Sequence, residues 1–449
     1  MKENIQTTRF ANGLTVLTER MTGARSASLG VWTRRGSRHE PEHLNGISHF
    51  IEHAVFKGTT RRTALDIAVE IDRLGGNFDA FTSHENVGFI LKVADKSLPQ
   101  AFDLLADMLC NPLFDEKELR RERRVIVEEM KMVEDTPEEF LGEIFQAAFF
   151  PEHALGLPIE GTRRTACTFD RETTQNYHAR LFQPKNLIVA AAGNVRHADI
   201  ETIANNLFAA QTDDSKSSNS KFQSSNSIGE IEDSGGENFD FKPETSNCPL
   251  LAAPIILKKK RELEQAHLLI AAPWIASGSE QRYAAHLLES IIGGGTSSRL
   301  WQQIRERRGL AYSVGASAMS FADCGVFSIF AATSPANLNE TIDLTIDEIR
   351  KIKKFGVTEM ELRLAKDQAH AAILLGLEDS AARAANLAQQ EITFGKIISL
   401  DETLACIEAV RAEEIAQLAG EFFRTENLAL AALGDLKNLR IERERLDVG

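Results

Sequence analysis

The sequence has few cysteines, and none of their spacings indicates a structural role. Its 449 residues include five cysteines, which are scattered along the chain and form no C-x-x-C pair. An odd, scattered set is typical neither of a disulfide framework nor of a thiolate metal cage, and it fits a reducing compartment. The five are Cys110, Cys167, Cys248, Cys324 and Cys406.

The chain also has no excess of basic residues. The chain has 51 lysines and arginines against 65 aspartates and glutamates, which leaves a formal charge of -14. Such a balance disfavours a phosphate backbone as ligand, so we expect no nucleic-acid partner. The 43% hydrophobic and 26% charged content is typical of a soluble globular protein, and the length allows more than one domain.

Long apolar runs are absent too. The first ten residues, MKENIQTTRF, lack the apolar core of a secretion signal and include Glu3, which also disfavours a transit peptide. Between Gly309 and Leu338 the only charge is Asp323, but Gly, Ser, Thr and Pro interrupt this stretch, and "GVFSIF" alternates like a strand. We therefore expect no membrane span and a cytoplasmic protein, or a mature form that has already been processed.

A change of composition divides the chain. From Gln211 to about Pro249 the sequence is rich in serine, poor in aliphatic residues and without periodicity. Such a segment buries too little apolar area to offset its chain entropy. We predict a flexible linker over 211–250 between an N-terminal domain, 1–210, and a C-terminal domain, 251–449.

The two halves resemble each other faintly. "FDEKELRRERRVIVEEM" and "VTEMELRLAKDQAHAAI" align Glu118-Leu119-Arg120 with Glu361-Leu362-Arg363, and each follows strand-like alternation and a helix. This order predicts an α+β fold made of two homologous domains, each a mostly antiparallel sheet with helices. Chance likeness between two amphipathic helices is the alternative.

The stretch "SHFIEH", residues 48–53, carries the clearest chemical pattern. At about 100° per residue, His49, Glu52 and His53 share one helix face, opposite an apolar stripe. Two imidazoles one turn apart can chelate a divalent ion, and the glutamate beside them could deprotonate a water molecule. The order is that of the H-x-x-E-H inverzincin motif. The stripe consists of Ile47, Phe50, Ile51, Ala54 and Val55. Three polar side chains on the solvated face of an ordinary helix would give the same pattern.

A second histidine pattern, "HEPEH", lies just upstream at residues 39–43. Pro41 cannot donate a helical hydrogen bond and disfavours helix at Glu40, so His39 and His43 are not expected one turn apart on a helix. We interpret this segment as a loop.

A metal site needs a third protein ligand, and the segment "EKELRRERRVIVEEMKMVED" offers one. Glu122 and Glu129 stand seven residues apart with apolar residues on both sides, and a carboxylate on an apolar face needs a cationic partner. That partner could be a buried arginine. Alternatively, Glu129 is a metal ligand and Glu122 orients a ligand from behind. The second half has Ala365 and Ala372 at these places and no H-x-x-E-H, so only the first half is expected to bind metal.

Together these segments resemble a known family. "GSRHEPEHLNGISHFIEHAVFKGT", "GGNFDAFTSHE" and "ERRVIVEEM", with Glu129 76 residues after His53, are similar to the pitrilysin-type inverzincin metallopeptidases. The likeness points to the branch of the mitochondrial processing peptidase and its bacterial relatives, and it covers nearly the whole chain outside the linker. It implies one Zn²⁺ per chain held by His49, His53 and Glu129, with Glu52 as general base and Glu122 supporting the site from behind.

The resemblance also implies substrate contacts. Arg305 and Tyr312, in "RERRGLAY", would reach toward the substrate carbonyl and the developing oxyanion, where donors are needed. Without the resemblance this segment reads as a helix that ends at Gly309. The family also binds the peptide as an added strand. The matching residues here are Phe78, Asp79, Ala80, Phe81 and Thr82, with Asp79 in place of the usual asparagine.

The function implied is that of a zinc-dependent endopeptidase acting on peptides, or on unfolded or presequence-like segments, inside a closed chamber. The family encloses peptides between four homologous domains, and this chain has two. We therefore expect a homodimer in which Arg305 and Tyr312 of one subunit face the zinc of the other, or a heterodimer with an inactive homologue. The alternative function is that of a non-catalytic partner subunit. A third possible function is that of an iron oxygenase, whose iron is held by two histidines and one carboxylate. It is disfavoured because it gives Glu52 no role.

Overall fold

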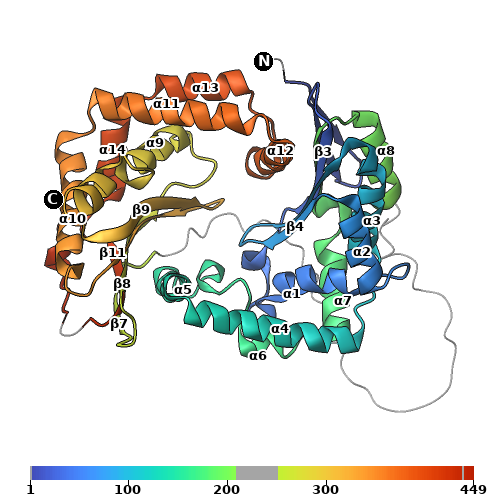
Figure 1. Cartoon of the computed structure of the whole chain (residues 1–449), viewed down its shortest axis with the longest axis horizontal. Helices are drawn as coiled ribbons and strands as arrows, with labels where there is room; N and C mark the ends of the chain where they lie inside the picture. Colours follow the sequence, from blue (N-terminus) through green and yellow to red (C-terminus); the bar gives the residue numbers. More distant parts are fainter. Residues whose placement is uncertain (1–2, 209–250, 437–438) are drawn as a thin grey trace, which may run out of the picture.

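The computed structural model describes residues 3–208, 251–436 and 439–449 of the chain. These residues form two β-sheets with helices packed on both faces of each sheet (Figure 1). The linker predicted over 211–250 lies outside the described residues, so the domain boundaries read from the sequence stay a prediction.

The first sheet has six strands in the order β1-β2-β6-β3-β5-β4. β2 and β6 are parallel, and the other neighbours are antiparallel. The order leaves β4 as an edge strand with one side open to a further strand. The strands are β1 (Ile5–Arg9), β2 (Thr15–Arg20), β3 (Ser26–Thr33), β4 (Asn77–Thr82), β5 (Val87–Ala94) and β6 (Leu187–Gly193).

The second sheet repeats this topology. Its order, β7-β11-β8-β10-β9, matches β2-β6-β3-β5-β4, and again only the first pair, β7 and β11, is parallel. The predicted α+β fold with two homologous domains is therefore confirmed. Its strands are β7 (Ile255–Lys259), β8 (Ala266–Trp274), β9 (Ala311–Ser320), β10 (Gly325–Thr333) and β11 (Ala429–Gly434).

The helices that resemble each other in sequence occupy matching places. α4 (Glu116–Asp135) and α11 (Glu359–Gly376) each follow a capping residue, Asp115 or Thr358, whose side chain accepts backbone N–H groups of the first turn. Glu118 and Glu361 are the third residues of these helices. The register proposed from the sequence is thus the register of the two structural halves.

One face of each sheet is covered by helices from the same half of the chain. On the first sheet these are α1 (Ile47–Ala54), α3 (Leu98–Cys110), α7 (Arg171–Leu181) and α8 (His197–Phe208), with α2 (Ala64–Leu74) packed on α3 and α6 (Arg163–Ala166) on α4. On the second sheet they are α9 (Arg282–Gly293), α10 (Leu338–Phe355), α13 (Leu400–Ala409) and α14 (Ala412–Phe422).

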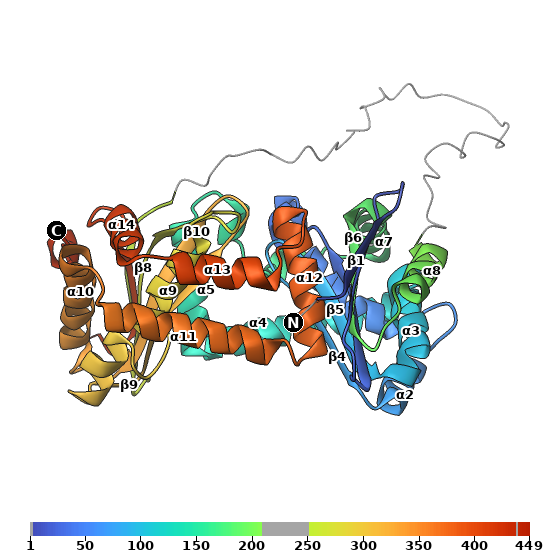
Figure 2. The same cartoon turned by 90° about the horizontal axis from the view of Figure 1, so that it is seen from above.

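The opposite faces are covered by an exchange of helices between the halves. α12 (Ser380–Phe394), from the second half, packs Ala384, Leu387 and Ala388 on the first sheet (Figure 2). α5 (Pro137–Phe149), from the first half, packs on β8 and β11 of the second sheet. Because both faces are covered, the central strands β6 and β11 are buried throughout, which explains their continuous apolar sequences "LIVAAAG" and "ALAALG".

An ion pair ties the two halves together beside this exchange. Arg38 donates two hydrogen bonds to Asp323, at 2.8 and 3.0 Å, and a third to Glu85. Asp323 is the only charge between Gly309 and Leu338. The one charged residue between Gly309 and Leu338 therefore forms an ion pair between the two halves. Among the described residues, no helix is both long and apolar enough to cross a membrane.

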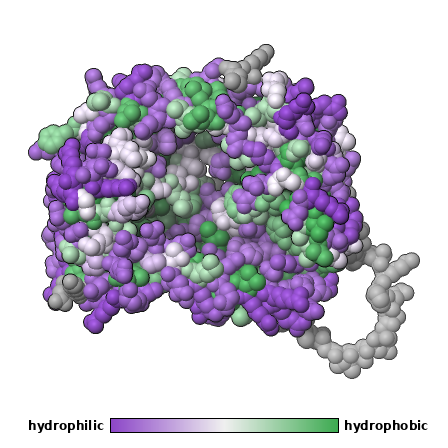
Figure 3. All heavy atoms as spheres, viewed as in Figure 1, coloured by the Kyte–Doolittle hydropathy of each residue, from purple (hydrophilic) through white to green (hydrophobic). Residues whose placement is uncertain are grey.

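The two halves surround a central hollow. In Figure 1, α4 and α11 run along opposite sides of the molecule, while β4 and β9 approach its middle from the two sheets. The space-filling view of the same face is hollowed at this place (Figure 3). Matching elements of the two halves thus line one concave face.

The helix exchange predicts that α12 contributes to the stability of the first half. Leu387 is fully buried against the first sheet, so Leu387→Ala should lower the unfolding free energy by about 2–5 kcal/mol. Leu65→Ala is the matched control, because Leu65 is 72% exposed on α2 and its loss should cost less than about 0.5 kcal/mol. Denaturant unfolding followed by far-UV circular dichroism measures both. Equal midpoints for the two variants would contradict the packing of α12.

Candidate metal centre

Helix α1 presents the histidine pair toward α4. Ile47, Phe50 and Ile51 are buried in the first core, as the predicted stripe requires, so His49, Glu52 and His53 emerge on the other side. Glu52 is buried and both histidines are half-buried. The alternative of a solvated helix face is therefore wrong.

The start of α1 is held by the "HEPEH" segment. Its N-cap, Gly46, has φ 94° and no side chain that could accept the first N–H groups. Glu40 does so instead: its carboxylate accepts the backbone N–H groups of Gly46 at 2.6 Å and Ser48 at 2.7 Å. Burial raises the pKa of Glu40 to about 7, against the lowering effect of these donors. The segment forms two single-turn 3-10 helices, Ser37–His39 and Glu42–Leu44, where a loop was expected. His39 and His43 belong to different turns, so they do not share one helix, as predicted.

Three candidate ligands meet where α1 faces α4. His49, His53 and Glu129 each offer one ligand atom, and these atoms all lie within 4.8 Å of one another. Nε2 of His53 is 3.6 Å from a carboxylate oxygen of Glu129, and the two imidazole rings are 4.6 Å apart. Two imidazoles and one carboxylate are the three protein ligands that a catalytic zinc site takes in several peptidases. Among the residues that the structure describes, no other group of this kind is found.

Glu122 supports His53 from behind. Its carboxylate is 3.5 Å from Nδ1 of His53 and 2.8 Å from Nζ of Lys57. The cation that the buried glutamate requires is therefore a lysine and not the arginine considered above. Burial alone would raise the pKa of Glu122, but bonding to His53 and Lys57 outweighs it and lowers the pKa. A carboxylate on the second nitrogen of an imidazole fixes the ring and its tautomer.

Only one of the two glutamates is buried on the apolar face of α4. The side chain of Glu122 is 6% exposed, whereas that of Glu129 is 36% exposed. Val125 and Met132, expected to flank the pair, point to solvent. A helical wheel does not predict the burial of these residues correctly. It treats every apolar residue as facing the core, but α4 lies at the edge of the core and some of its apolar residues are exposed.

The burial and charges around the two histidines favour a cation among them. Burial, with the charge of His53 beside it, lowers the pKa of His49 to about 4, which keeps this ring neutral. Nδ1 of His49 is buried and has no hydrogen-bond partner in the described part of the chain. Burial would also lower the pKa of His53, but Glu122, Glu129 and Glu52 raise it instead. This concentration of negative charge suits a divalent cation.

Glu52 stands between the histidines and strand β4. The Thr82 hydroxyl donates to its Oε2 at 2.6 Å. Burial raises the pKa of Glu52, and the charges of Glu129 and Asp79 add to this effect, while Thr82 and His53 oppose it. Phe78 packs edge to face on Phe56, at 5.3 Å between ring centres. The five residues matched to the substrate strand thus form the edge strand β4, beside the candidate base.

Arg305 and Tyr312 lie in the other half of the chain. Arg305 is in the π-helix η8 (Trp301–Glu306), and Tyr312 is on β9. The guanidinium of Arg305 stacks on the Tyr312 ring at 4.7 Å. Within the described residues, neither side chain bonds to His49, Glu52, His53 or Glu129. η8 ends at Glu306, and Gly309, with φ 62°, follows a short turn, so a helix does end in this segment but three residues before the expected position.

The second half retains part of the metal motif, which the sequence reasoning missed. α9 occupies the place of α1, and its buried Ala284, Leu287 and Leu288 repeat the spacing of the α1 stripe. On that register His286 and Glu289 match His49 and Glu52, but Ser290 stands where His53 would be, in the sequence "HLLES". The repeated spacing of the apolar residues was the available signal. With Ala365 and Ala372 on α11, this half lacks three of the five groups of the candidate centre.

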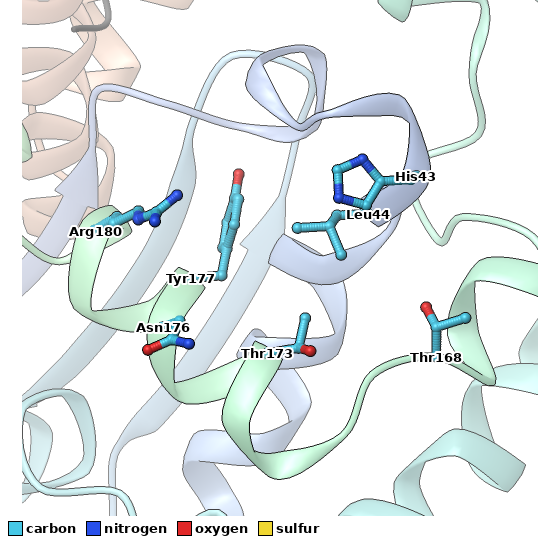
Figure 4. Close-up of a pocket in the computed structure, with 7 residues that line it drawn as sticks. All are labelled: His43, Leu44, Thr168, Thr173, Asn176, Tyr177 and Arg180. Carbon is cyan, nitrogen blue, oxygen red and sulfur yellow. The ribbon is translucent and has the colours of Figure 1, made fainter. Parts of the chain in front are cut away.

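A pocket lies apart from the candidate ligands. It has a volume of about 440 Å³ and lies beside α7 and the turn Glu42–Leu44 (Figure 4). His43 of "HEPEH" lines it and belongs to no candidate metal group of the described residues. A pocket of about 340 Å³ adjoins His286 and Glu289. The candidate ligands do not line either of them, in keeping with a centre on an open concave face.

Comparison with known protein families gives two matches. The family model described as Insulinase (Peptidase family M16) matches residues 15–163, and the model described as Peptidase M16 inactive domain matches residues 168–369. The first match contains all the candidate metal ligands, and the second contains Arg305 and Tyr312.

Curated relatives match over nearly the full length. The chain is 34% identical over 439 residues to an uncharacterized zinc protease of Streptomyces coelicolor, covering 98% of this chain and 91% of that one. It is 34% identical over 428 residues to the uncharacterized zinc protease YmxG of Bacillus subtilis, covering 95% and 98%.

Solved structures share the fold at lower identity. A protease from Helicobacter pylori superposes with a TM-score of 0.82 at 20% identity, covering 96% of this chain and 99% of that one. A chain of Complex III2 from Candida albicans superposes with a TM-score of 0.79 at 19% identity, covering 98% and 99%. At these identities the likeness concerns the fold alone.

The geometry predicts that Glu129 is needed for metal affinity. Glu129→Gln should lower the affinity for zinc at least about tenfold, because a neutral amide replaces an anionic ligand. Glu128→Gln is the matched control: Glu128 is the adjacent residue of α4, 68% exposed and paired with Lys131. Competition with a chromophoric chelator measures both affinities. Equal zinc affinity in the two variants would contradict the assignment of Glu129.

Proposed function

Because the chain belongs to the insulinase family of peptidases, family M16, we propose that it is a zinc-dependent endopeptidase. Its substrates would be peptides or unfolded, presequence-like segments. The observation that carries this proposal is the convergence of His49, His53 and Glu129 within 4.8 Å, with Glu52 beside them. A non-catalytic partner subunit would need none of these residues.

The residues divide the work of hydrolysis. His49, His53 and Glu129 would hold one zinc ion per chain. When bound, zinc supplies a Lewis acid and lowers the pKa of water. Glu52 would accept the proton of the attacking water and pass it to the leaving amine. The Thr82 hydroxyl fixes Oε2 of Glu52. Glu122, itself paired with Lys57, orients the ring of His53.

The peptide would bind along β4. This strand is at the edge of the first sheet, and Thr82 connects it to the candidate base. An extended peptide added to such an edge gains main-chain hydrogen bonds that depend little on its sequence. Asp79 is exposed on this strand and adds negative charge beside Glu52, which favours a basic residue of the peptide there.

A second copy of the chain would complete the chamber. The helices α4 and α11, on opposite sides of the hollow, expose apolar side chains that a partner could cover. Arg305 and Tyr312 make no contact with the metal group of their own chain among the described residues, which is expected if they serve the partner. A heterodimer with an inactive homologue is the other arrangement, and we expect either in the cytoplasm. The exposed residues are Val125, Met132, Met360, Leu364, Leu374 and Leu375.

The role of Glu52 can be tested by amide substitution. Glu52→Gln should keep zinc bound but lower the turnover of a quenched fluorescent peptide by about 10²–10⁴-fold, because the amide cannot accept a proton. Glu289→Gln, at the matching place of α9, is the control and should stay active. Peptide cleavage by Glu52→Gln at the wild-type rate would reject Glu52 as the base.

Sharing of the site between subunits can be tested by mixing variants. One chain carries Glu52→Gln, and the other carries Arg305→Ala together with Tyr312→Phe. Each alone should be nearly inactive, and a mixture unfolded and refolded together should regain activity, because mixed dimers have one complete site. Two separately refolded samples, combined afterwards without exchange, serve as the control. No gain after joint refolding, with mixed dimers shown by two affinity tags, would contradict a shared site.

A further inference from the structure

The guanidinium of Arg305 contacts two aromatic rings. Its guanidinium carbon lies 4.0 Å from the ring centre of Trp301 and 4.7 Å from that of Tyr312. Both distances are within the range of a cation–π contact, and indole is the strongest aromatic partner for a cation. Trp301 is at the start of the π-helix η8, four residues before Arg305.

The Trp301 ring is itself fixed. Its indole N–H donates to Oε1 of Glu306 at 3.0 Å, and the side chain packs on the core of the second half. The same short helix is anchored by the buried Ile304, whose carbonyl oxygen accepts the N–H of Leu310 at 3.0 Å. Tyr312, by contrast, is 77% exposed. Of the two rings, Trp301 is therefore the rigid one.

We propose that Trp301 is a positioning residue that holds the Arg305 guanidinium ready for the substrate. The inference rests on the proposed peptidase function. A cation–π contact uses the face of the guanidinium and leaves the N–H groups on its edge available. In the described part of the chain, the Arg305 side chain makes no hydrogen bond or ion pair, so these donors can turn to a peptide carbonyl. A long side chain held in one place loses less freedom when it binds.

The free protein offers a first test that needs no activity. Of the three tryptophans, Trp32 and Trp274 are buried at 3% and 4% exposure, so changes in emission near η8 report Trp301. Arg305→Met should shift or brighten the tryptophan emission, because the cation leaves the indole face. The same substitution in a Trp301→Phe chain should have no effect. Identical spectra for wild type and Arg305→Met would overturn the stack.

The second test measures peptide binding and turnover. In the Glu52→Gln background, Trp301→Leu should weaken binding of a fluorescent peptide about tenfold, and Trp301→Phe should lie between it and the parent chain. In the active chain, Trp301→Leu should lower kcat/KM by a similar factor, with zinc content and thermal midpoint unchanged. Phe355→Leu is the matched control. Phe355 is also an exposed aromatic residue whose ring contacts a cation, Lys354, but it is far from Arg305 in the sequence.

A double-mutant cycle separates positioning from a merely structural role. If Trp301 acts through Arg305, Trp301→Leu should cause no further loss once Arg305 is Met. The inference would be overturned if Trp301→Leu weakened peptide binding equally in the wild-type and Arg305→Met chains. It would also be overturned if the Trp301→Leu chain bound and cleaved peptide like wild type. Neither result would affect the peptide cleavage by wild type. A wild-type chain, loaded with zinc, that cleaves no peptide would instead reject the proposed function, and the positioning role with it.

Discussion

His53 of α1 lies between the two glutamates of α4, and the candidate centre depends on this contact. Its Nδ1 faces Glu122 and its Nε2 faces Glu129, at 3.5 and 3.6 Å. Two carboxylates close to one imidazole repel each other unless positive charge lies among them. Lys57 supplies one such charge behind the ring. On the open side, where Glu129 and His49 meet His53, a divalent cation would supply the other.

The exchange of α5 and α12 makes the two halves depend on each other. Each helix covers a sheet face of the other half, so separating the halves would expose apolar strands on both sides. The Arg38 ion pair with Asp323 adds a polar contact across the same junction. The duplicated units therefore form one body with a concave face, in which one half carries the metal group and the other carries Arg305.

Local features of this protein were readable from its residues. The apolar stripe predicted α1, and the register of Glu118 with Glu361 predicted the duplication that the sheet topology confirms. Other features were not readable. The partner of Glu122 is Lys57, a residue with no pattern of its own, and the exposure of Val125 follows from where α4 leaves the core. The remnant "HLLES" left a signal in the repeated apolar spacing of α9, but only the place of α9 in the fold identifies it as the counterpart of α1.

By itself, the sequence determined what depends on neighbours within one helix. A spacing of three and four residues places His49, Glu52 and His53 on one face of α1 whatever surrounds it, because the rotation per residue is constant. The tertiary structure alone decided which groups meet from distant parts of the chain. The approach of Glu129 to His53 and the transfer of α12 to the first sheet result from helix packing. Such packing minimises the exposed apolar surface of the whole chain, and no local spacing records it.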